Sequence, residues 1–560
     1  MKNIIFCMIA ITFLTACNQR TSKTEETTSP PNIILIVADD LGYSDIGPFG
    51  GDIHTPVLDK LSKESMLFSN FHVLPTCSPT RSVLLTGNDN HIAGLGIMGE
   101  ASYPELKGLP GYTGHLSDQV VTIPEILREK GYHTYMAGKW HLGEEAGQTP
   151  ADRGFEESFA LLQGGGSHYA DQKPLSPPQV MDYRVNGKKL AALPADFYSA
   201  RNYTDTLLHY IDKNKADHKP FFIYASYTSP HDPLQAPKEY IEKYKGKFDM
   251  GWDSLRTLRL SNLKALGIVP KDVNSFAPSG IPKWESLNAR QKAEYARDME
   301  VYAAMVDYLD MSIGRIIDYL KQQGLYDNTM ILFMSDNGAN GIMATTYPGN
   351  ADGKYLSSFN NELENRGLPN SFVEMGPGWA QASSSPFRLF KSFTSEGGIK
   401  APLIIKMPAG VKNQGQWNKS FIHVSDLLPT VLALADAKYP GEVKGKPVKQ
   451  PIGKSILPVL KGESTAVHSD EGMGWELFER KAYIKGNWKI LRLPKPFGTG
   501  DWQLYNIEND PGETNDLSQQ FPAKRDSLIN NWIQYAKEND VVNHKGYYDL
   551  LLEKSLTGGH

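Results

Sequence analysis

The sequence predicts an α/β protein, with a large mixed and mostly parallel sheet flanked by helices and a smaller C-terminal α+β domain. Unbroken apolar runs, such as residues 33–38, indicate strands that are buried on both faces, as in parallel sheets. Helical patterns separate these runs, and the longest is an apolar stripe from about residue 288 to 323. After about Ala437, short segments bounded by turns indicate an antiparallel sheet, and a helix follows over about residues 522–537.

The N-terminal segment has the pattern of an export signal. Lys2 precedes an apolar run over residues 4–14, which is too short to cross a bilayer as a mature helix. Residues 14–17, Leu-Thr-Ala-Cys, resemble a bacterial lipobox, which implies cleavage before Cys17 and a lipid on its sulfur. An ordinary signal peptide with an incidental cysteine is the alternative. We therefore expect an exported, membrane-anchored lipoprotein, in the periplasm or on the cell surface. The expected organisation is a signal peptide over 1–16, a flexible tether over 17–31, a large domain over 32–437 and a C-terminal α+β domain over 438–560.

Composition excludes one class of partner and singles out one cysteine. The 560 residues carry a formal net charge of −5, so the chain lacks the basic character typical of nucleic-acid binding. Of its three cysteines, Cys7 falls in the signal peptide and Cys17 is the expected lipid site. Cys77 is then alone in the mature chain, which leaves it no disulfide partner and suggests that it has a chemical role.

Paired oxygen-bearing side chains follow two of the predicted strands. The first apolar run ends in Asp39 and Asp40, and the strand over 330–335 ends in Asp336 and Asn337. In open α/β sheets, ligands gather beyond the carboxyl ends of the strands. Adjacent carboxylates repel each other unless a cation lies between them, and hard divalent cations bind such oxygens. The two strand ends together predict a Ca²⁺ or Mg²⁺ site, with a solvated turn as the alternative at each.

Residues 75–87 read as a loop that runs into a helix. Pro79 suits the first turn of that helix, and Gly87 ends it. Cys77 therefore lies just ahead of a helix N-terminus, with the cationic Arg81 one turn further on. Free N–H groups and the positive end of the helix dipole favour an anion at this place. The residues alone predict a reactive cysteine beside a site for a negatively charged group, and the alternative is a small buried side chain.

Further polar groups follow two more predicted strands. The strand over 133–137 leads to Lys139 and His141, whose side chains point the same way if the chain stays extended. The strand over 221–225 leads to His231 at the same edge of the sheet. The remaining elements expected in the large domain are a helix opened by Thr55 and Pro56, a strand over about 66–72, a helix over 124–130 with a capping box from Thr122 to Glu125, a strand over 402–407 and a helix that begins at Asp426.

Two motifs resemble the signatures of one enzyme family. Cys77-x-Pro79-x-Arg81, followed by an apolar pair, Thr86 and Gly87, resembles the first signature of the type I, formylglycine-dependent sulfatases. Gly-Tyr-x-Thr at 131–134, followed by Gly-Lys-Trp-His at 138–141, is similar to the second. The segments over 91–96 and 111–116 are similar to those of bacterial arylsulfatases, to which the match is closest. The resemblance covers residue 32 to about 537 and implies an alkaline-phosphatase-like fold, with the catalytic sulfatase domain over 32–437.

The resemblance implies hydrolysis of sulfate monoesters with cleavage of the S–O bond, which releases inorganic sulfate and an alcohol or phenol. A maturation enzyme would convert Cys77 to Cα-formylglycine, whose hydrate attacks sulfur, and His141 would later deprotonate its second hydroxyl. The substrate would be a small-molecule or glycan sulfate ester. One divalent cation is implied, Ca²⁺ by family precedent with Mg²⁺ as the alternative, and its ligands would be Asp39, Asp40, Asp336, Asn337 and the converted Cys77.

The other catalytic roles are carried over from the resemblance in the same way. Arg81 and Lys139 would neutralise the attacking oxyanion and hold its geometry, and Asp336 would accept its proton. His231 and Lys391 would hold the sulfate and protonate the departing oxygen. Lys391 takes this role because the family has a lysine five residues before the Glu of a Glu-Gly-Gly motif, as here.

Two other readings stay open on the sequence. A phosphate mono- or diesterase of the same superfamily is the first, since phosphoryl and sulfuryl centres are both tetrahedral with anionic oxygens. The single set of metal ligands and the cysteine favour sulfate. A non-catalytic lipoprotein that binds sulfated glycans is the second, although every expected catalytic position is filled. The loops over 164–198 and 341–385 are expected to face the substrate and to select among aryl, glycan and other alcohol sulfates.

Overall fold

The computed structural model describes residues 29–277, 280–409 and 415–542. The predicted signal peptide, with Cys7, and the part of the tether that contains Cys17 lie outside the described residues. None of the described helices is both long enough and apolar enough to span a bilayer.

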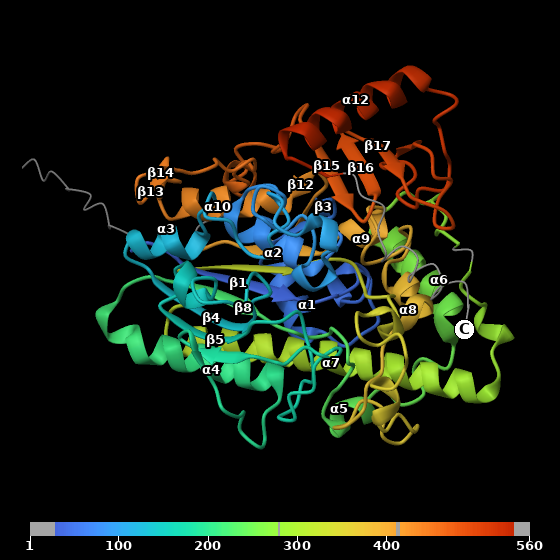
Figure 1. Ribbon diagram of the computed structural model, residues 1–560, viewed down its shortest axis with the longest axis horizontal. Helices are drawn as coiled ribbons and strands as arrows, with labels where there is room; N and C mark the ends of the chain where they lie inside the picture. The colour runs from blue at the N-terminus through green and yellow to red at the C-terminus, as the bar shows by residue number, and fades with distance from the viewer. Residues whose placement is uncertain (1–28, 278–279, 410–414, 543–560) are drawn as a thin grey trace, which may run out of the picture.

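A ten-stranded sheet forms the centre of the large domain (Figure 1). Strand β1 (Asn32–Ala38) lies between β8 (Phe221–Ser226) and β9 (Thr329–Ser335), and both are parallel to it. Strand β10 (Leu403–Lys406) is antiparallel to its two neighbours, so the prediction of a mixed, mostly parallel sheet is confirmed. The other strands of this sheet are β2 (Met66–Phe68), β4 (His133–Lys139), β5 (Glu157–Leu161), β6 (Tyr183–Val185), β7 (Lys188–Lys189) and β11 (Gln416–Asn418).

Helices cover both faces of this sheet (Figure 1). On one side lie α4 (Ser199–Asn214) and α7 (Ala289–Gln322), and on the other lie α2 (Cys77–Thr86), α3 (Ile123–Glu129) and α10 (Leu427–Leu434). The predicted capping box of α3 is present, since Thr122 accepts from the Glu125 N–H while the Glu125 carboxylate accepts from Thr122. The other α-helices before the C-terminal sheet are α1 (Pro56–Lys63), α5 (Lys238–Glu242), α6 (Gly251–Ala265), α8 (Gly376–Ser383), α9 (Glu396–Ile399) and α11 (Leu457–Leu460).

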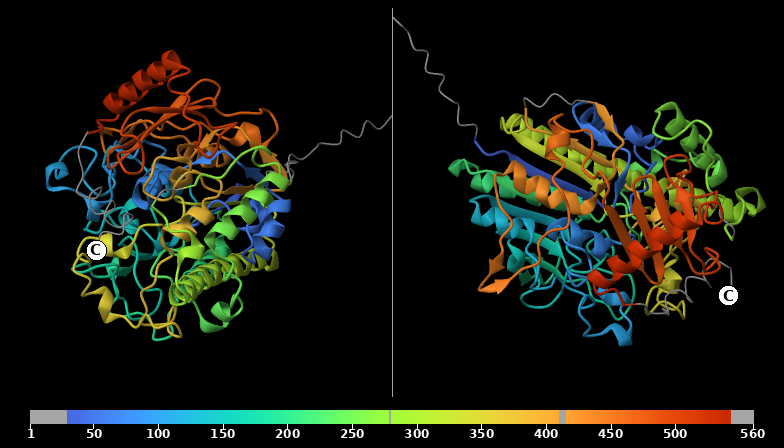
Figure 2. Two further views of the ribbon diagram at one scale, coloured as in Figure 1. Left: turned by 90° about the vertical axis from the view of Figure 1, so that its right-hand side faces the viewer. Right: turned by 90° about the horizontal axis from the view of Figure 1, so that it is seen from above.

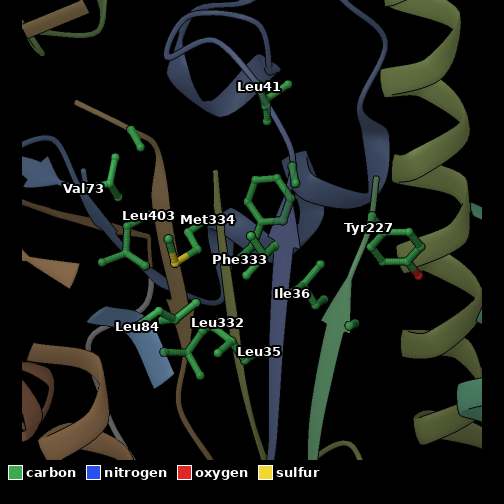
Figure 3. Close-up of a cluster of buried hydrophobic side chains, with 14 of the residues drawn as sticks. Leu35, Ile36, Leu41, Val73, Leu84, Tyr227, Leu332, Phe333, Met334 and Leu403 are labelled. Atoms are coloured by element: carbon green, nitrogen blue, oxygen red, sulfur yellow. The ribbon is translucent and has the colours of Figure 1, made fainter. Parts of the chain in front are cut away.

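The core explains why the strands are apolar on both faces. Leu35 of β1 is in register with Leu332 of β9, and Figure 3 shows both near Leu84 of α2. The next pair in register, Ile36 and Phe333, points to the opposite face, toward the side on which Tyr227 lies beside a helix (Figure 3). Each such side chain contributes about 1.5–3 kcal/mol when it is fully buried. This double-sided burial fixes the strands and therefore the positions of the polar residues that follow them.

One expected strand is in fact two. The sequence indicates a single strand over about 66–72, but the chain turns at Ser69 and Asn70. Residues before the turn form β2 in the large sheet, whereas β3 (Phe71–His72) pairs with β12 (Ile422–His423) in a separate two-stranded sheet. Both halves are buried, and only the two polar residues Ser69 and Asn70 separate their apolar residues, too short a break to predict the turn.

The C-terminal part has the expected antiparallel sheet and helix. Its strands are β15 (Gly472–Leu477), β16 (Arg480–Lys485), β17 (Trp488–Arg492) and β18 (Gln503–Asn506), and a small hairpin of β13 (Glu442–Val443) and β14 (Lys446–Pro447) precedes them. Helix α12 (Pro522–Glu538) covers the side of this sheet that faces away from the large domain (Figures 1 and 2). Strand β15 is absent from the sequence prediction, because two glycines interrupt its alternating pattern. The boundary near residue 438 stays a prediction.

Candidate active site

The predicted polar residues meet at the carboxyl edge of the large sheet. Asp39 and Asp40 follow β1, and Asp336 and Asn337 follow β9, all four side chains being buried. The backbone N–H of Asp40 donates to Asp336 Oδ1 at 3.2 Å, and Asn337 Nδ2 donates to Asp40 Oδ1 at 2.6 Å. Parallel neighbouring strands bring these ends together, as the sequence predicts.

Cys77 is the first residue of α2, so the helix begins at this cysteine and not just after it, as the sequence predicts. Its side chain is buried, and Sγ lies 3.9 Å from Asp40 Oδ1. Burial raises the pKa of the Cys77 thiol, and the nearby cations Lys139 and Lys391 only partly offset this effect. The thiol is therefore neutral near pH 7 and is a poor nucleophile, because the thiolate is the reactive form.

Two buried cations are fixed beside Cys77. The Arg81 guanidinium donates through Nε and Nη2 to Asp336 Oδ2, at 2.9 and 2.7 Å. The Lys139 ammonium lies 2.8 and 3.0 Å from the two oxygens of Asp39. Burial raises the pKa of Asp39, but Lys139, His231 and Arg81 outweigh burial and lower this pKa to about 2. The anionic neighbours of Arg81 and Lys139 outweigh burial and raise the pKa of both groups, so both stay charged near neutral pH and present fixed positive charge to an anion.

Lys391 and His231 form the next part of the site. Lys391 Nζ donates to Asp40 Oδ2 at 2.8 Å and lies 3.2 Å from His231 Nε2. Burial and then the nearby Lys391 ammonium lower the pKa of His231, which falls to about 4 although Asp232 and Asp39 act in the opposite direction. His231 Nδ1 lies 2.6 Å from the carbonyl oxygen of Asp232, so Nδ1 carries the hydrogen and donates to it. The neutral ring therefore turns the lone pair of Nε2 toward Lys391.

The oxygen groups suit a divalent cation. Ligand atoms of Asp39, Asp40, Cys77 and His231 lie within 4.8 Å of one another. The side-chain oxygen of Asn337 is buried, and no group of the described chain donates to it. A buried acceptor without a donor is costly unless a cation faces it. This unsatisfied oxygen and the adjacent carboxylates fit a hard divalent cation such as Ca²⁺ or Mg²⁺.

His141 reaches the site by a different route from the predicted one. Strand β4 ends at Lys139, and His141 has a φ of 57°, in the left-handed region. The chain is therefore not extended at His141, and the condition under which Lys139 and His141 would point the same way is not met. His141 Nε2 lies 2.9 Å from Glu100 Oε1, whereas its buried Nδ1 has no hydrogen-bond partner among the described residues. Gly164 makes room for this ring, because a Cβ at residue 164 would lie 2.7 Å from it.

Four of the predicted catalytic residues, Cys77, His141, His231 and Lys391, line one pocket. The loops over 164–198 and 341–385 contribute walls, as expected. The other lining residues are Met98, Glu100, Ala101, Gly164, Leu175, Ser176, Gln179, Asn340, Ile342, Tyr347, Pro348 and Ser392.

Sequence reasoning missed several of these groups. Glu100, whose carboxylate holds His141, lies in an irregular segment that gives no periodic signal. Tyr224 and Ser226 accept hydrogen bonds from Arg81; Tyr224 lies inside the expected strand over 221–225, and Ser226 directly follows it. A polar residue at the end of such a strand, like Ser226, is the one signal that could have identified a partner for Arg81.

Comparisons with known proteins show the family to which the chain belongs. A sequence model of the sulfatase family matches residues 31–437, and one named N-sulphoglucosamine sulphohydrolase, C-terminal, matches residues 387–529. An uncharacterized sulfatase of Schizosaccharomyces pombe is 44% identical over 529 residues, which cover 91% of this chain and 94% of the relative. The arylsulfatase of Klebsiella aerogenes is 39% identical over 432 residues, or 77% of this chain and 92% of the relative.

Solved structures place the fold in the same group. The crystal structure of Ps i-CgsB in complex with k-i-k-neocarrahexaose has a TM-score of 0.65 and 25% identity, and it covers 95% of this chain and 98% of that one. The phosphonate monoester hydrolase of Agrobacterium radiobacter, at 16% identity and a TM-score of 0.57 over 91% of this chain and 96% of that one, shares the fold alone. The alkaline-phosphatase-like fold that the resemblance implies is confirmed. The resemblance itself is confirmed as well, and the chain belongs to the sulfatase family, the enzymes that hydrolyse sulfuric esters.

Proposed function

We propose that this sulfatase cleaves the S–O bond of aryl sulfates and related monoesters through a formylglycine made from Cys77. The observation that carries the proposal is a buried, neutral thiol at the floor of a pocket, beside fixed cations. A neutral thiol in that place is a poor nucleophile. An aldehyde hydrate at residue 77 supplies two hydroxyl groups, one for attack and one for the later release of sulfate.

The same proposal includes a divalent cation, Ca²⁺ with Mg²⁺ as the alternative. Asp39, Asp40, Asp336, Asn337 and the converted residue 77 would hold it, and the unsatisfied Asn337 oxygen supports this assignment. When bound, the cation supplies positive charge that polarises the sulfate and favours deprotonation of a hydroxyl group beside it.

Side chains of the protein move the protons in the first half of the reaction. Asp336 accepts the proton of the attacking hydroxyl while its oxygen bonds to sulfur, and Arg81 and Lys139 offset the developing negative charge. The bond from sulfur to the ester oxygen breaks, and this oxygen takes a proton from the Lys391–His231 pair. Burial lowers the pKa of Lys391, but Asp40 and the neighbouring anionic groups outweigh burial and raise it well above its usual value, so the pair holds a proton to give.

His141 acts in the second half. Its Nε2–H donates to Glu100, and this bond leaves the lone pair on Nδ1 free to accept a proton. His141 takes the proton of the second hydroxyl at residue 77, the carbon–oxygen bond to sulfate breaks, and the aldehyde forms again. A serine ester lacks that hydroxyl and therefore cannot release sulfate in this way.

The pocket walls favour an apolar alcohol or phenol. Met98, Leu175, Ile342 and Pro348 face the space above the catalytic groups. Such a wall gains free energy by excluding water from an aryl ring. The relative from Klebsiella aerogenes is called an arylsulfatase, which supports the same class. A glycan sulfate is the second candidate, because Ps i-CgsB was solved with an oligosaccharide.

We further propose that the protein is exported and held at the membrane by a lipid on Cys17. The described chain enters the fold at Ser29, where Asn328 donates to the Ser29 carbonyl at 3.1 Å. Strand β1 then runs for seven residues, or about 20 Å, before it reaches Asp39. A tether at that end of the strand would leave the pocket accessible.

Substrate comparison tests the proposed activity. Protein produced together with a formylglycine-generating enzyme should hydrolyse 4-nitrophenyl sulfate far faster than 4-nitrophenyl phosphate, and Cys77→Ala should be folded and inactive. Preference for the phosphate would reinstate the phosphatase reading. Faster turnover of a sulfated oligosaccharide than of the aryl ester would favour the glycan candidate.

A further inference from the structure

One arginine of the C-terminal sheet reaches into the large domain and contacts the backbone next to a catalytic lysine. Arg480 is the first residue of β16, and its side chain is fully buried. Its Nη1 donates to the carbonyl oxygen of Ser392 at 2.6 Å. The guanidinium carbon also lies 4.5 Å from the centre of the Phe393 ring and 5.6 Å from that of Phe478. A planar, permanently charged group can stack on rings and donate to a carbonyl at the same time.

Ser392 is held from both sides in a conformation that it would not adopt alone. Its φ is 73°, in the left-handed region, which costs a residue with a Cβ about 1–2 kcal/mol. Its N–H donates at 2.7 Å to the carbonyl of Pro75, in the loop before Cys77, and Arg480 binds its carbonyl. The surrounding contacts therefore determine where the chain turns at this residue.

Lys391 depends on that turn. Its backbone N–H donates at 3.0 Å to the carbonyl of Ala339, in the loop after β9. From this anchored position its ammonium reaches Asp40 at 2.8 Å and His231 at 3.2 Å. A shift of the Ser392 peptide would change the direction from which the side chain enters the site.

We propose that Arg480 is a positioning residue for Lys391: by holding the Ser392 carbonyl, it aims the ammonium at the departing ester oxygen. This inference rests on the proposed role of Lys391 in protonating that oxygen. It makes the C-terminal domain part of the catalytic apparatus, although none of its residues lines the pocket among those described.

The two domains have other polar links, so loss of Arg480 need not separate them. Arg388 Nη2 donates to the Phe497 carbonyl at 2.7 Å. Lys489, fully buried, lies 2.9 Å from Glu396 and 2.7 Å from Glu513. Since none of these contacts involves the Arg480 side chain, we expect them to persist in a variant changed only at Arg480.

The test compares leaving groups. Phenyl sulfate releases a basic phenolate that needs a proton, whereas 4-nitrophenyl sulfate releases a stable one that needs it far less. Arg480→Met keeps a side chain that can pack against Phe393 and Phe478 but removes the hydrogen bond. We expect its kcat/KM for phenyl sulfate to fall roughly tenfold or more, since a misplacement of about 1 Å can cost 100-fold. The fall for 4-nitrophenyl sulfate should be clearly smaller.

Two further variants at and near this residue sharpen the result. Arg480→Lys keeps the charge but cannot hold both the carbonyl and the ring, so it should show the same selective loss to a smaller degree. Thermal unfolding shows whether Arg480→Met folds, and if it does not, Arg480→Lys replaces it in the comparison. Arg492→Met is the matched control, because Arg492 of β17 donates to the Gly500 carbonyl at 2.9 Å in the same sheet, and it should leave both rates near those of the wild type.

Lys391→Ala separates this inference from the proposed function. If Lys391→Ala shows no dependence on the leaving group, the proposed role of Lys391 is wrong, and the inference falls with it. If Lys391→Ala shows the dependence and both Arg480 variants lose activity equally on the two esters, or lose none, Arg480 is only structural. The inference is then overturned while the proposed function stands.

Discussion

Replacing Asp39 with asparagine removes one buried negative charge from beside Lys139. Both side chains are fully buried, and the Lys139 ammonium lies 2.8 and 3.0 Å from the Asp39 oxygens. The fall in the pKa of Asp39 from 3.8 to about 2 corresponds to about 2 kcal/mol in favour of the charged form. Loss of one partner of a buried ion pair typically costs about 3–5 kcal/mol. We therefore expect Asp39→Asn to lower the free energy of unfolding by about 2–5 kcal/mol at pH 7.

The assay is urea unfolding of the metal-free proteins, followed by tryptophan fluorescence. The pKa of Asp39 is lower in the folded state than in the unfolded one, so its contribution is present above about pH 4 and is lost as the pH falls through about 2. The difference between wild type and Asp39→Asn should therefore be constant from pH 5 to 8 and shrink in more acidic solution. Asp318→Asn, at an exposed position of α7, is the control and should change stability by less than about 0.5 kcal/mol. An equally small effect of Asp39→Asn would refute the account of the buried pair.

Three further results are expected. Dialysis against a strong chelator should inactivate the enzyme slowly, because the site is buried. Added Ca²⁺ should restore activity and raise the unfolding midpoint. Full activity after verified metal removal would exclude the metal site. Glu100→Gln should lower kcat roughly 10-fold or more with little change in KM, since the neutral amide stabilises a protonated His141 less well, whereas an unchanged kcat would leave Glu100 without a role in turnover. Cys17→Ala should move the protein from the membrane fraction to the soluble fraction with kcat unchanged, and unaltered partition would contradict lipid anchoring.

The parts of the site that follow buried strands could be predicted from the sequence. The apolar run of β1 must lie inside the sheet, so Asp39 and Asp40 must lie at its carboxyl edge, and the same holds for Asp336 after β9. The first turn and the end of α2 likewise follow from Pro79 and Gly87, whose backbone preferences are local, although the helix begins two residues before Pro79.

The rest depends on contacts between residues far apart in the chain. His141 has a left-handed backbone conformation, which the sequence does not indicate because the residue is not glycine. Its partner Glu100 lies 41 positions away in an irregular loop. Arg480 lies 88 positions from Ser392, and nothing in the pattern of a short strand indicates that its side chain contacts this distant loop. Periodicity reports which face of an element is buried, but it does not report which buried group meets which.

The most direct test of the central claim is the mass of the peptide that contains residue 77, in protein produced with a formylglycine-generating enzyme. Cys77 is the one free cysteine of the described chain, and burial keeps its thiol neutral. The account predicts a peptide whose mass shows an aldehyde in place of the thiol, which a hydrazine reagent captures in proportion to the activity of each preparation. A fully active enzyme whose Cys77 keeps an intact thiol, alkylated after unfolding, would contradict the account and return the reaction to cysteine nucleophilic catalysis.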